Sequence, residues 1–379
     1  MSNYINPGDG GFRVARASFY IDKSGMIAYL NSCLGTKNRF VCATRPRRFG
    51  KTAAAHMISA YYDKSVRSDE LFADLKISRD ETFERHLDKY TVVYLNMKNI
   101  MNLSNSNIYE MIANITRNLK EDLNCLSDER SIAEVLDQHF KQTGMKFVFV
   151  VDGWDCLKRE TPDDFAGHER CAEFLASFLA DKEYLALAYM TGILPIGENS
   201  KSLKIFTQYS MTDPRELAEY FGFTETEVRE ACDANGLDFE VLKKWYDGYP
   251  LGGFKIYNPY SVSKATLQRT CEDYWCQKLS YHALRDLLGK DIEGLQEAAT
   301  TLLAKDRVKV DISKYRNDLT KSESVDDVLT LLVHLGYLAY DAEKSEVLIP
   351  NKELEDEFLN AFHEPGWTEK MVKTDKRVD

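Results

Sequence analysis

The residues of this chain best suited to chemistry lie at positions 45–52, which read R-P-R-R-F-G-K-T. Gly50, Lys51 and Thr52 fit the end of the phosphate-binding loop G-x-x-x-x-G-K-[ST]. In that loop backbone N–H groups surround the phosphates, the lysine reaches the β- and γ-phosphates, and the hydroxyl holds Mg²⁺. Arg45 stands in place of the first glycine, and Pro46 removes one N–H donor. The alternative is a basic surface turn that binds no nucleotide.

The flanking segments predict a strand before this loop and a helix after it. Residues 39–43 form a short apolar, β-prone run. Residues 52–62 contain strong helix formers and no breaker. A phosphate would then lie at a helix N-terminus, where free N–H groups and the positive end of the dipole favour an anion. The predicted nucleotide-binding residues are Arg45, Pro46, Arg47, Arg48, Phe49, Gly50, Lys51 and Thr52.

A second part of the predicted site lies further along the chain. Residues 146–152 form a continuous apolar run that ends in Asp152, as a central parallel strand would. In P-loop enzymes such an aspartate binds Mg²⁺, and an acidic residue after it polarises the attacking water. Here Gly153 occupies that place. We predict Thr52 and Asp152 as metal ligands and Asp155 as a displaced catalytic carboxylate, although a turn would point Asp155 elsewhere.

Two more predicted strands, residues 91–96 and 185–191, complete a parallel sheet. Because ligands bind outside the carboxyl ends of such strands, Thr191 would face the γ-phosphate as a polar sensor, with an ordinary turn residue as the alternative. Helices are expected near residues 24–34, 106–123, 129–142 and 168–180. The predicted fold class is α/β: a P-loop core with helices on its sheet, then a helical region and a winged-helix-like module.

The chain resembles the bacterial family of predicted AAA-ATPase-like proteins, whose P-loop reads R-P-R-R-F-G-K-[ST]. The other matching motifs lie in order at residues 19–24, 190–196, 209–213, 219–224, 245–249 and 257–261. The resemblance implies an ATPase core that binds ATP and Mg²⁺, with the altered loop as a family trait.

Two departures from the family pattern limit what the resemblance implies. Relatives carry D-E-Y-D where residues 152–155 read D-G-W-D, so the hydrolytic glutamate is lost, and Gly153→Glu is expected to raise turnover. Relatives also commonly continue into a nuclease-like domain of the PD-(D/E)xK kind. No strand-borne D…(E/D)-x-K pair is found up to Asp379, so nuclease activity is not expected.

Composition excludes several classes of protein. The chain is 44% hydrophobic and has 21 Tyr and 19 Phe, enough for buried cores. A net charge of −11 argues against coating of nucleic acid by the whole molecule. We expect no membrane span, no signal peptide and a cytoplasmic location. The eight cysteines lack zinc-site spacing and are expected to be free thiols.

The chain is predicted to divide into an N-terminal segment, a core, a helical and aromatic lid, a winged-helix-like domain and a polar tail, at residues 1–36, 37–208, 209–279, 280–363 and 364–379. The aromatic turns at 245–250 and 257–260 are interpreted as loops pinned to a core, with nucleotide contact or docking as alternatives. The last domain would have a hairpin at 338–349. Its acidic wing and helix favour packing or protein binding over DNA.

Three hypotheses follow from these residues. The first is a switch that binds ATP and Mg²⁺, hydrolyses slowly or not at all, and acts on protein partners. The second is an active ATPase that uses Asp155 or Glu160 as its base. The third is an interaction protein that has kept the P-loop fold and lost the ligand.

Overall fold

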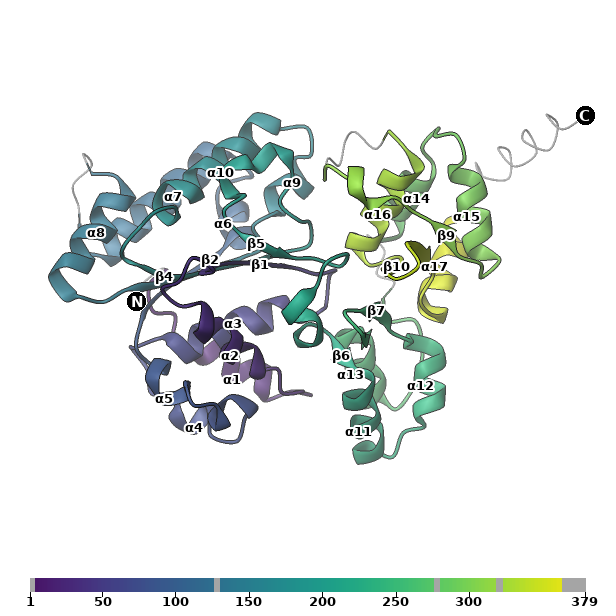
Figure 1. Ribbon diagram of the computed structural model, residues 1–379, viewed down its shortest axis with the longest axis horizontal. Helices are drawn as coiled ribbons and strands as arrows, with labels where there is room; N and C mark the ends of the chain where they lie inside the picture. The colour runs from purple at the N-terminus through teal and green to yellow at the C-terminus, as the bar shows by residue number, and fades with distance from the viewer. Residues whose placement is uncertain (1–3, 126–129, 276–279, 318–322, 363–379) are drawn as a thin grey trace, which may run out of the picture. The chain divides into compact units, whose positions relative to one another are not determined.

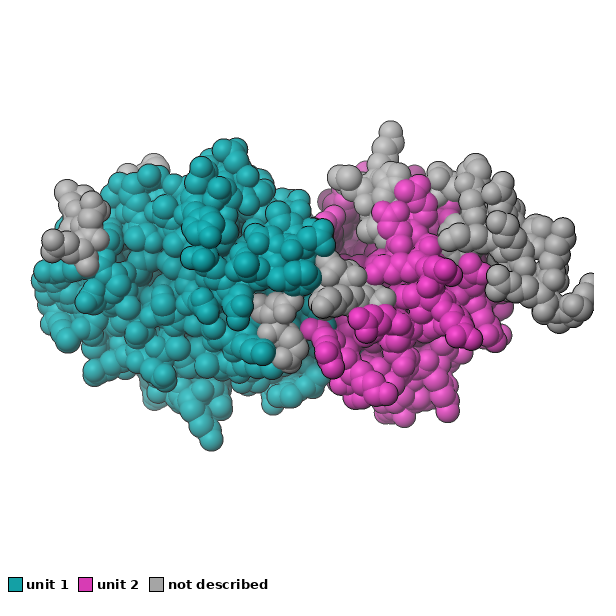
Figure 2. All heavy atoms as spheres, turned by 90° about the horizontal axis from the view of Figure 1, so that it is seen from above, with its two compact units in different colours: residues 1–45, 50–221, 317–320 teal, residues 46–49, 222–316, 321–379 magenta. Residues whose placement is uncertain are grey.

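The computed structural model describes residues 4–125, 130–275, 280–317 and 323–362. The chain forms two compact units (Figures 1 and 2). Unit 1 comprises residues 1–45, 50–221 and 317–320, and unit 2 comprises residues 46–49, 222–316 and 321–379. The predicted polar tail lies outside the described residues. Unit 1 thus contains the predicted N-terminal segment and core, continues to residue 221, and lacks the front of the P-loop.

A parallel five-stranded sheet of order β2-β3-β4-β1-β5 forms the centre of unit 1. Its strands are β1 (Phe40–Thr44), β2 (Thr91–Asn96), β3 (Phe147–Asp152), β4 (Leu185–Gly192) and β5 (Thr207–Tyr209). The four predicted strands are confirmed, and β5 was not predicted. Because β4 lies between β1 and β3, Thr191 is the register partner of both Ala43 and Asp152.

Helices cover both faces of this sheet (Figure 1). One face carries α1 (Gly10–Arg16), α2 (Gly25–Cys33), α3 (Lys51–Tyr62), α4 (Asp69–Phe72), η1 (Lys76–Arg79) and α5 (Phe83–His86). The other carries α6 (Met97–Leu103), α7 (Ile108–Asp122), α8 (Ile132–Thr143), α9 (Cys156–Glu160) and α10 (Phe165–Leu179). The short helices η2 (Glu198–Leu203) and η3 (Arg215–Tyr220) follow β4 and β5.

The two hydrophobic cores explain why the strand residues are apolar without interruption. Along β3, Val148 and Val150 belong to the core beneath α3, whereas Phe149 and Val151 belong to the core beneath α7 and α10. Successive strand residues point to opposite faces, so a strand covered on both faces needs apolar residues at every position. In β3 the apolar run then ends in a carboxylate, Asp152, at the carboxyl end of the strand.

Unit 2 contains two small antiparallel sheets and seven α-helices within the described residues. The first sheet joins β6 (Phe223–Thr224), β8 (Phe254–Tyr257) and β7 (Tyr249–Leu251), and the second joins β10 (Ala339–Asp341), β11 (Glu346–Leu348) and β9 (Val308–Lys309). The helices are α11 (Glu225–Asn235), α12 (Phe239–Tyr246), α13 (Pro259–Gln268), α14 (Ser280–Leu288), α15 (Leu295–Leu303), α16 (Val325–Leu335) and α17 (Lys352–Phe362), with a short η4 (Ile312–Lys314).

Local sequence signals account for several of these elements. A capping box begins α11, with Thr224 accepting from the Glu227 N–H, and Gly236 ends the helix with φ +66°. The predicted hairpin at 338–349 is confirmed as β10 and β11. The assignment of this region as a winged-helix module remains a prediction. In the part of the chain that the structure describes, no helix is both long and apolar enough to span a membrane.

Candidate functional site

The P-loop leads from β1 into α3, as the sequence predicts. Gly50 has φ +82° at the N-cap of α3, and an added Cβ there would meet no atom within 4 Å. Glycine is therefore favoured at position 50 by backbone conformation and not by lack of space. Arg48 also has a positive φ of +67°, whereas Arg45 does not. An arginine is thus tolerated at the place of the first glycine.

The Arg45 side chain lies in the interior of unit 1 and is fully buried. Its guanidinium donates to the carbonyl oxygens of Thr44, Tyr209 and Leu217 at 2.8, 2.7 and 3.2 Å. It also lies 5.2 Å from the ring centre of Phe221. Burial lowers the pKa of Arg45 to about 10, so the group stays charged at neutral pH. The structure therefore does not bring this guanidinium to the predicted phosphate position, and it acts as a bridge between backbone segments.

Lys51, Thr52 and Asp152 lie together at the start of α3 and the end of β3. The Lys51 ammonium donates to the Arg45 carbonyl at 2.9 Å, and the Thr52 hydroxyl donates to Asp152 Oδ2 at 2.9 Å. Asp152 is 6% exposed. Burial raises the pKa of Asp152, while the Thr52 hydrogen bond and the Lys51 charge act in the opposite direction. Residues 100 positions apart thus lie together, and their role as metal ligands remains a prediction.

Two aromatic residues that the sequence reasoning did not assign to the site lie beside Asp152. The Tyr94 hydroxyl, on β2, donates to Asp152 Oδ2 at 3.3 Å. The His56 ring, on α3, stacks on Tyr94 with centroids 5.3 Å apart. Burial lowers the pKa of His56, which favours the neutral ring, while the Asp152 charge acts in the opposite direction. Tyr94 lies beside Asp152 because β2 pairs with β3. No pattern near Tyr94 in the sequence indicates a place in the site, so sequence reasoning could not find it.

Gly153 has a backbone conformation that favours glycine. Its φ is +76°, and its N–H donates to the Thr191 carbonyl at 2.7 Å. An added Cβ would meet no atom within 4 Å, so the constraint is conformational. The expectation that Gly153→Glu would simply restore a catalytic carboxylate needs correction, because any L side chain at this φ strains the turn that follows Asp152.

The other two predicted catalytic residues are held by neighbouring strands and loops. Asp155 is fully buried, and its Oδ2 accepts from Arg159 Nε at 2.9 Å and from the N–H groups of Ile193 and Leu194 at 3.1 and 3.0 Å. The Thr191 hydroxyl is also buried and donates to the Ala43 carbonyl at 2.9 Å. In this arrangement Asp155 fixes the loop after β4, and Thr191 ties β4 to β1. The register places Thr191, but not the Asp155 carboxylate, as a neighbour of Asp152.

The front of the P-loop packs within unit 2. The Arg48 guanidinium lies 4.0 Å from the Tyr260 ring centre and donates to the Tyr274 carbonyl at 2.8 Å. Phe49 is fully buried against Tyr249, with ring centroids 5.4 Å apart. Arg47 is exposed. Of the three loop arginines predicted to add charge near a phosphate, Arg47 alone has an exposed side chain.

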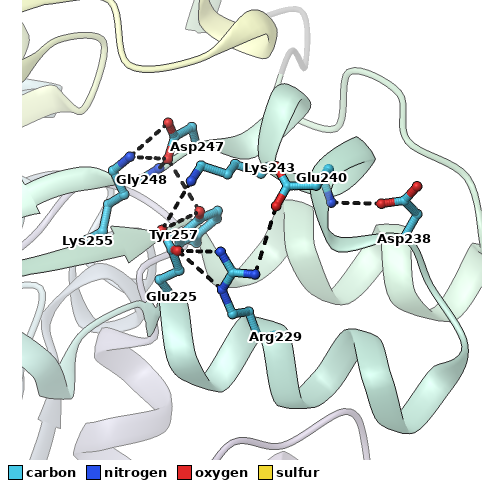
Figure 3. Close-up of polar contacts among 9 residues, drawn as sticks. All are labelled: Glu225, Arg229, Asp238, Glu240, Lys243, Asp247, Gly248, Lys255 and Tyr257. Atoms are coloured by element: carbon cyan, nitrogen blue, oxygen red, sulfur yellow. Dashed lines mark hydrogen bonds and ion pairs between the residues drawn. The ribbon is translucent and has the colours of Figure 1, made fainter.

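The aromatic turns of unit 2 are pinned to their own unit by hydrogen bonds. Figure 3 shows the Tyr257 hydroxyl between Glu225 and Asp247, with donor–acceptor distances of 3.4 and 3.3 Å. Lys255 pairs with the same Asp247 at 3.0 Å. A Cβ at Gly248 would overlap the Ile256 backbone, which explains the glycine between Asp247 and Tyr249. These contacts support the interpretation of pinned loops.

The cysteines and histidines add no further site among the described residues. All seven described cysteines are free thiols, and Cys276 lies outside that part of the chain. No group of three or more metal-binding side chains is found in the described ranges.

Two comparisons with other proteins concern parts of the sequence. Residues 14–201 match the family model described as predicted AAA-ATPase. A curated protein of Azotobacter chroococcum mcd 1, described as an uncharacterized protein in the vnfD 5′ region, is 22% identical over 280 residues. The match covers 71% of this chain and 52% of that protein, so the chain spans about half the length of the curated relative it matches.

Solved structures of similar extent include two proteins of Aeropyrum pernix. They are the ORC1 protein in complex with DNA and the ORC2 protein in ADPNP–ADP complexes, at 11% and 12% identity. Each match covers 98% of this chain, with 100% and 98% of the other chain, at a TM-score of 0.36. At this TM-score the likeness carries no argument. Through residues 14–201, the chain belongs to the predicted AAA-ATPase family.

Proposed function

We propose that this chain binds ATP with Mg²⁺ and works as a nucleotide-controlled switch whose hydrolysis is slow or absent. The observation that carries the proposal is the Thr52 hydroxyl 2.9 Å from Asp152 Oδ2 at the N-terminus of α3, next to Lys51. Backbone N–H groups at a helix start, a lysine and two oxygen ligands are the parts that a P-loop uses for a nucleotide phosphate. Family membership supports the same ligand.

The oxygen donors at this site fit Mg²⁺. A hydroxyl and a carboxylate are the hard ligands that this ion prefers, and it is commonly held by one or two protein groups together with substrate phosphates. When bound, the ion would neutralise charge on the phosphates. Thr52 is exposed and Asp152 is nearly buried, so one ligand faces solvent while the other is fixed by Tyr94. Lys51 would exchange its contact with the Arg45 carbonyl for a phosphate oxygen.

Slow hydrolysis is supported by the surroundings of Asp152. A catalytic carboxylate normally follows the metal-binding aspartate, and here that position is glycine with φ +76°. The nearest alternative in sequence, Asp155, uses one carboxylate oxygen for an arginine and two backbone N–H groups. Its other oxygen, Oδ1, makes no hydrogen bond to the described residues but is buried, so this carboxylate is shielded from an attacking water. A bound nucleotide would then persist and could set the conformation of the chain toward protein partners.

The test is binding of a fluorescent ATP analogue with and without Mg²⁺, with phosphate release measured in the same samples. Thr52→Val keeps the shape of an exposed side chain and removes the predicted ligand oxygen, so Mg²⁺-dependent affinity should fall by about tenfold or more. Thr300→Val is the matched control, since Thr300 is also an exposed helical threonine. Lys51→Ala should abolish binding.

Three outcomes separate the hypotheses. Mg²⁺-dependent binding with little phosphate release supports the switch. Steady release that Lys51→Ala abolishes would indicate an active ATPase with another base, and release that persists in that variant would indicate a contaminant. No nucleotide affinity in the wild-type protein would overturn the proposal and leave an interaction protein with a P-loop fold.

A further inference from the structure

Arg48 lies in the front half of the P-loop, residues 46–49, which belongs to unit 2. Its φ of +67° lies in the left-handed region, which is unfavourable for a residue with a Cβ. Such a conformation persists only where its surroundings hold it. Two contacts do so: the Tyr260 ring beneath the guanidinium at 4.0 Å, and the Tyr274 carbonyl, which accepts from Arg48 at 2.8 Å.

A single carboxylate orders both of these Arg48 partners. Glu353 Oε1 accepts from the N–H groups of Tyr274 and Trp275, both at 2.7 Å. The Ser261 hydroxyl contacts both Glu353 oxygens, at 3.0 and 2.9 Å. Ser261 follows Tyr260 directly in the first turn of α13. Because Glu353 is only 1% exposed, these bonds are shielded from solvent.

The residues on either side of Arg48 are also fixed within unit 2. Phe49 is fully buried against Tyr249. The Tyr249 hydroxyl donates to the Gly336 carbonyl at 2.6 Å, and a Cβ at Gly336 would lie 2.6 Å from Pro46 Cβ. Pro46, Arg48 and Phe49 are therefore each held by a separate contact, whereas Arg47 stays exposed. This half of the loop is thus held by contacts within unit 2.

We propose that Arg48, Tyr260 and Glu353 are positioning residues for nucleotide binding. They keep the front of the P-loop in the conformation that receives the phosphates, without touching the nucleotide themselves. The inference rests on the proposed function, since it concerns the same loop. It gives Pro46 and Arg48 a role in the loop, since both lie at points where the loop contacts the rest of unit 2. Perturbing these side chains should then weaken ATP binding although each lies outside the phosphate site.

The decisive pair of variants is Tyr260→Leu and Tyr260→Phe, measured as the Kd of the fluorescent ATP analogue with Mg²⁺. Leucine removes the aromatic face under Arg48, and we expect Kd to rise about fivefold, as for loss of one cation–π contact. Phenylalanine keeps that face and should restore the wild-type Kd. Tyr109→Leu is the matched control, because Arg170 lies 4.7 Å from the Tyr109 ring centre on α7, in unit 1.

Arg48→Lys provides a second variant that keeps the charge, loses the planar guanidinium, and should raise Kd by a similar factor. Circular dichroism of each variant checks that it is folded. If the wild-type protein binds the analogue and both Tyr260→Leu and Arg48→Lys have the same Kd as the wild type, this inference is overturned and the proposed function is left intact. Equal weakening by Tyr260→Phe and Tyr260→Leu would also overturn it, because the ring face would then be irrelevant. Failure of the wild-type protein to bind would instead refute the proposed function.

Discussion

Replacement of Gly153 tests whether backbone conformation or a missing carboxylate limits hydrolysis. With φ at +76°, an L side chain costs about 1–2 kcal/mol relative to glycine. Alanine also lowers the entropy of the unfolded chain, which offsets about 0.4–1 kcal/mol of that cost. Since no atom lies within 4 Å of the added Cβ, no steric term is expected. Gly153→Ala and Gly153→Glu should therefore each lower the free energy of unfolding by about 1 kcal/mol.

The effect on turnover separates the two explanations. A correctly placed general base contributes about 10²–10⁴-fold to a rate. A glutamate on a strained turn should contribute much less, so we expect Gly153→Glu to raise phosphate release by less than about tenfold, a barrier change of about 1.4 kcal/mol. The assays are urea unfolding and phosphate release at saturating ATP, for the wild-type protein and both variants.

Gly144→Ala is the matched control for the unfolding measurement. Gly144 has φ +70°, has no atom within 4 Å of an added Cβ, and ends α8. It should lose a similar free energy of unfolding without any change in phosphate release. A rise of 100-fold or more in Gly153→Glu, with wild-type stability, would refute the reasoning and show that only the carboxylate was missing.

Two further predictions concern buried charged groups. Arg45→Met leaves three carbonyl oxygens without their donor, so the free energy of unfolding should fall by about 3 kcal/mol or more, while the ATP affinity of the folded fraction stays within about twofold. A selective loss of ATP affinity at unchanged stability would contradict this. Burial raises the pKa of Glu353 to about 7, from 4.5 when unfolded, so its stabilising contribution is complete below pH 4.5 and is lost as pH rises through 7. Urea midpoints should fall from pH 5 to 7, and they should fall less steeply in Glu353→Gln. Some pH dependence should remain in that variant, because burial also raises the pKa of Glu357 to about 7. An equal dependence of the urea midpoint on pH in the wild type and in Glu353→Gln would contradict this prediction.

Local patterns were sufficient for most of the core elements. The runs before Thr44 and up to Asp152 are apolar at every position, and strands buried on both faces require that pattern. A helix start is also marked in the sequence where an N-cap residue accepts a hydrogen bond from the first turn, as Thr224 does in α11. Very short elements such as β5 and β6 were not predicted, because two or three residues carry no period and pair only through distant strands.

By itself, the sequence determined the P-loop, the strand that ends in Asp152 and the family of the chain. Those features depend on residue types at fixed spacing, which a single segment contains. Tertiary structure alone decided where the loop arginines point, because each guanidinium follows its acceptors: Arg45 to carbonyls of unit 1, and Arg48 to an aromatic ring and a carbonyl of unit 2. It likewise decided that position 153 favours glycine, since the turn after Asp152 has a positive φ there and its N–H bonds the Thr191 carbonyl on the neighbouring strand.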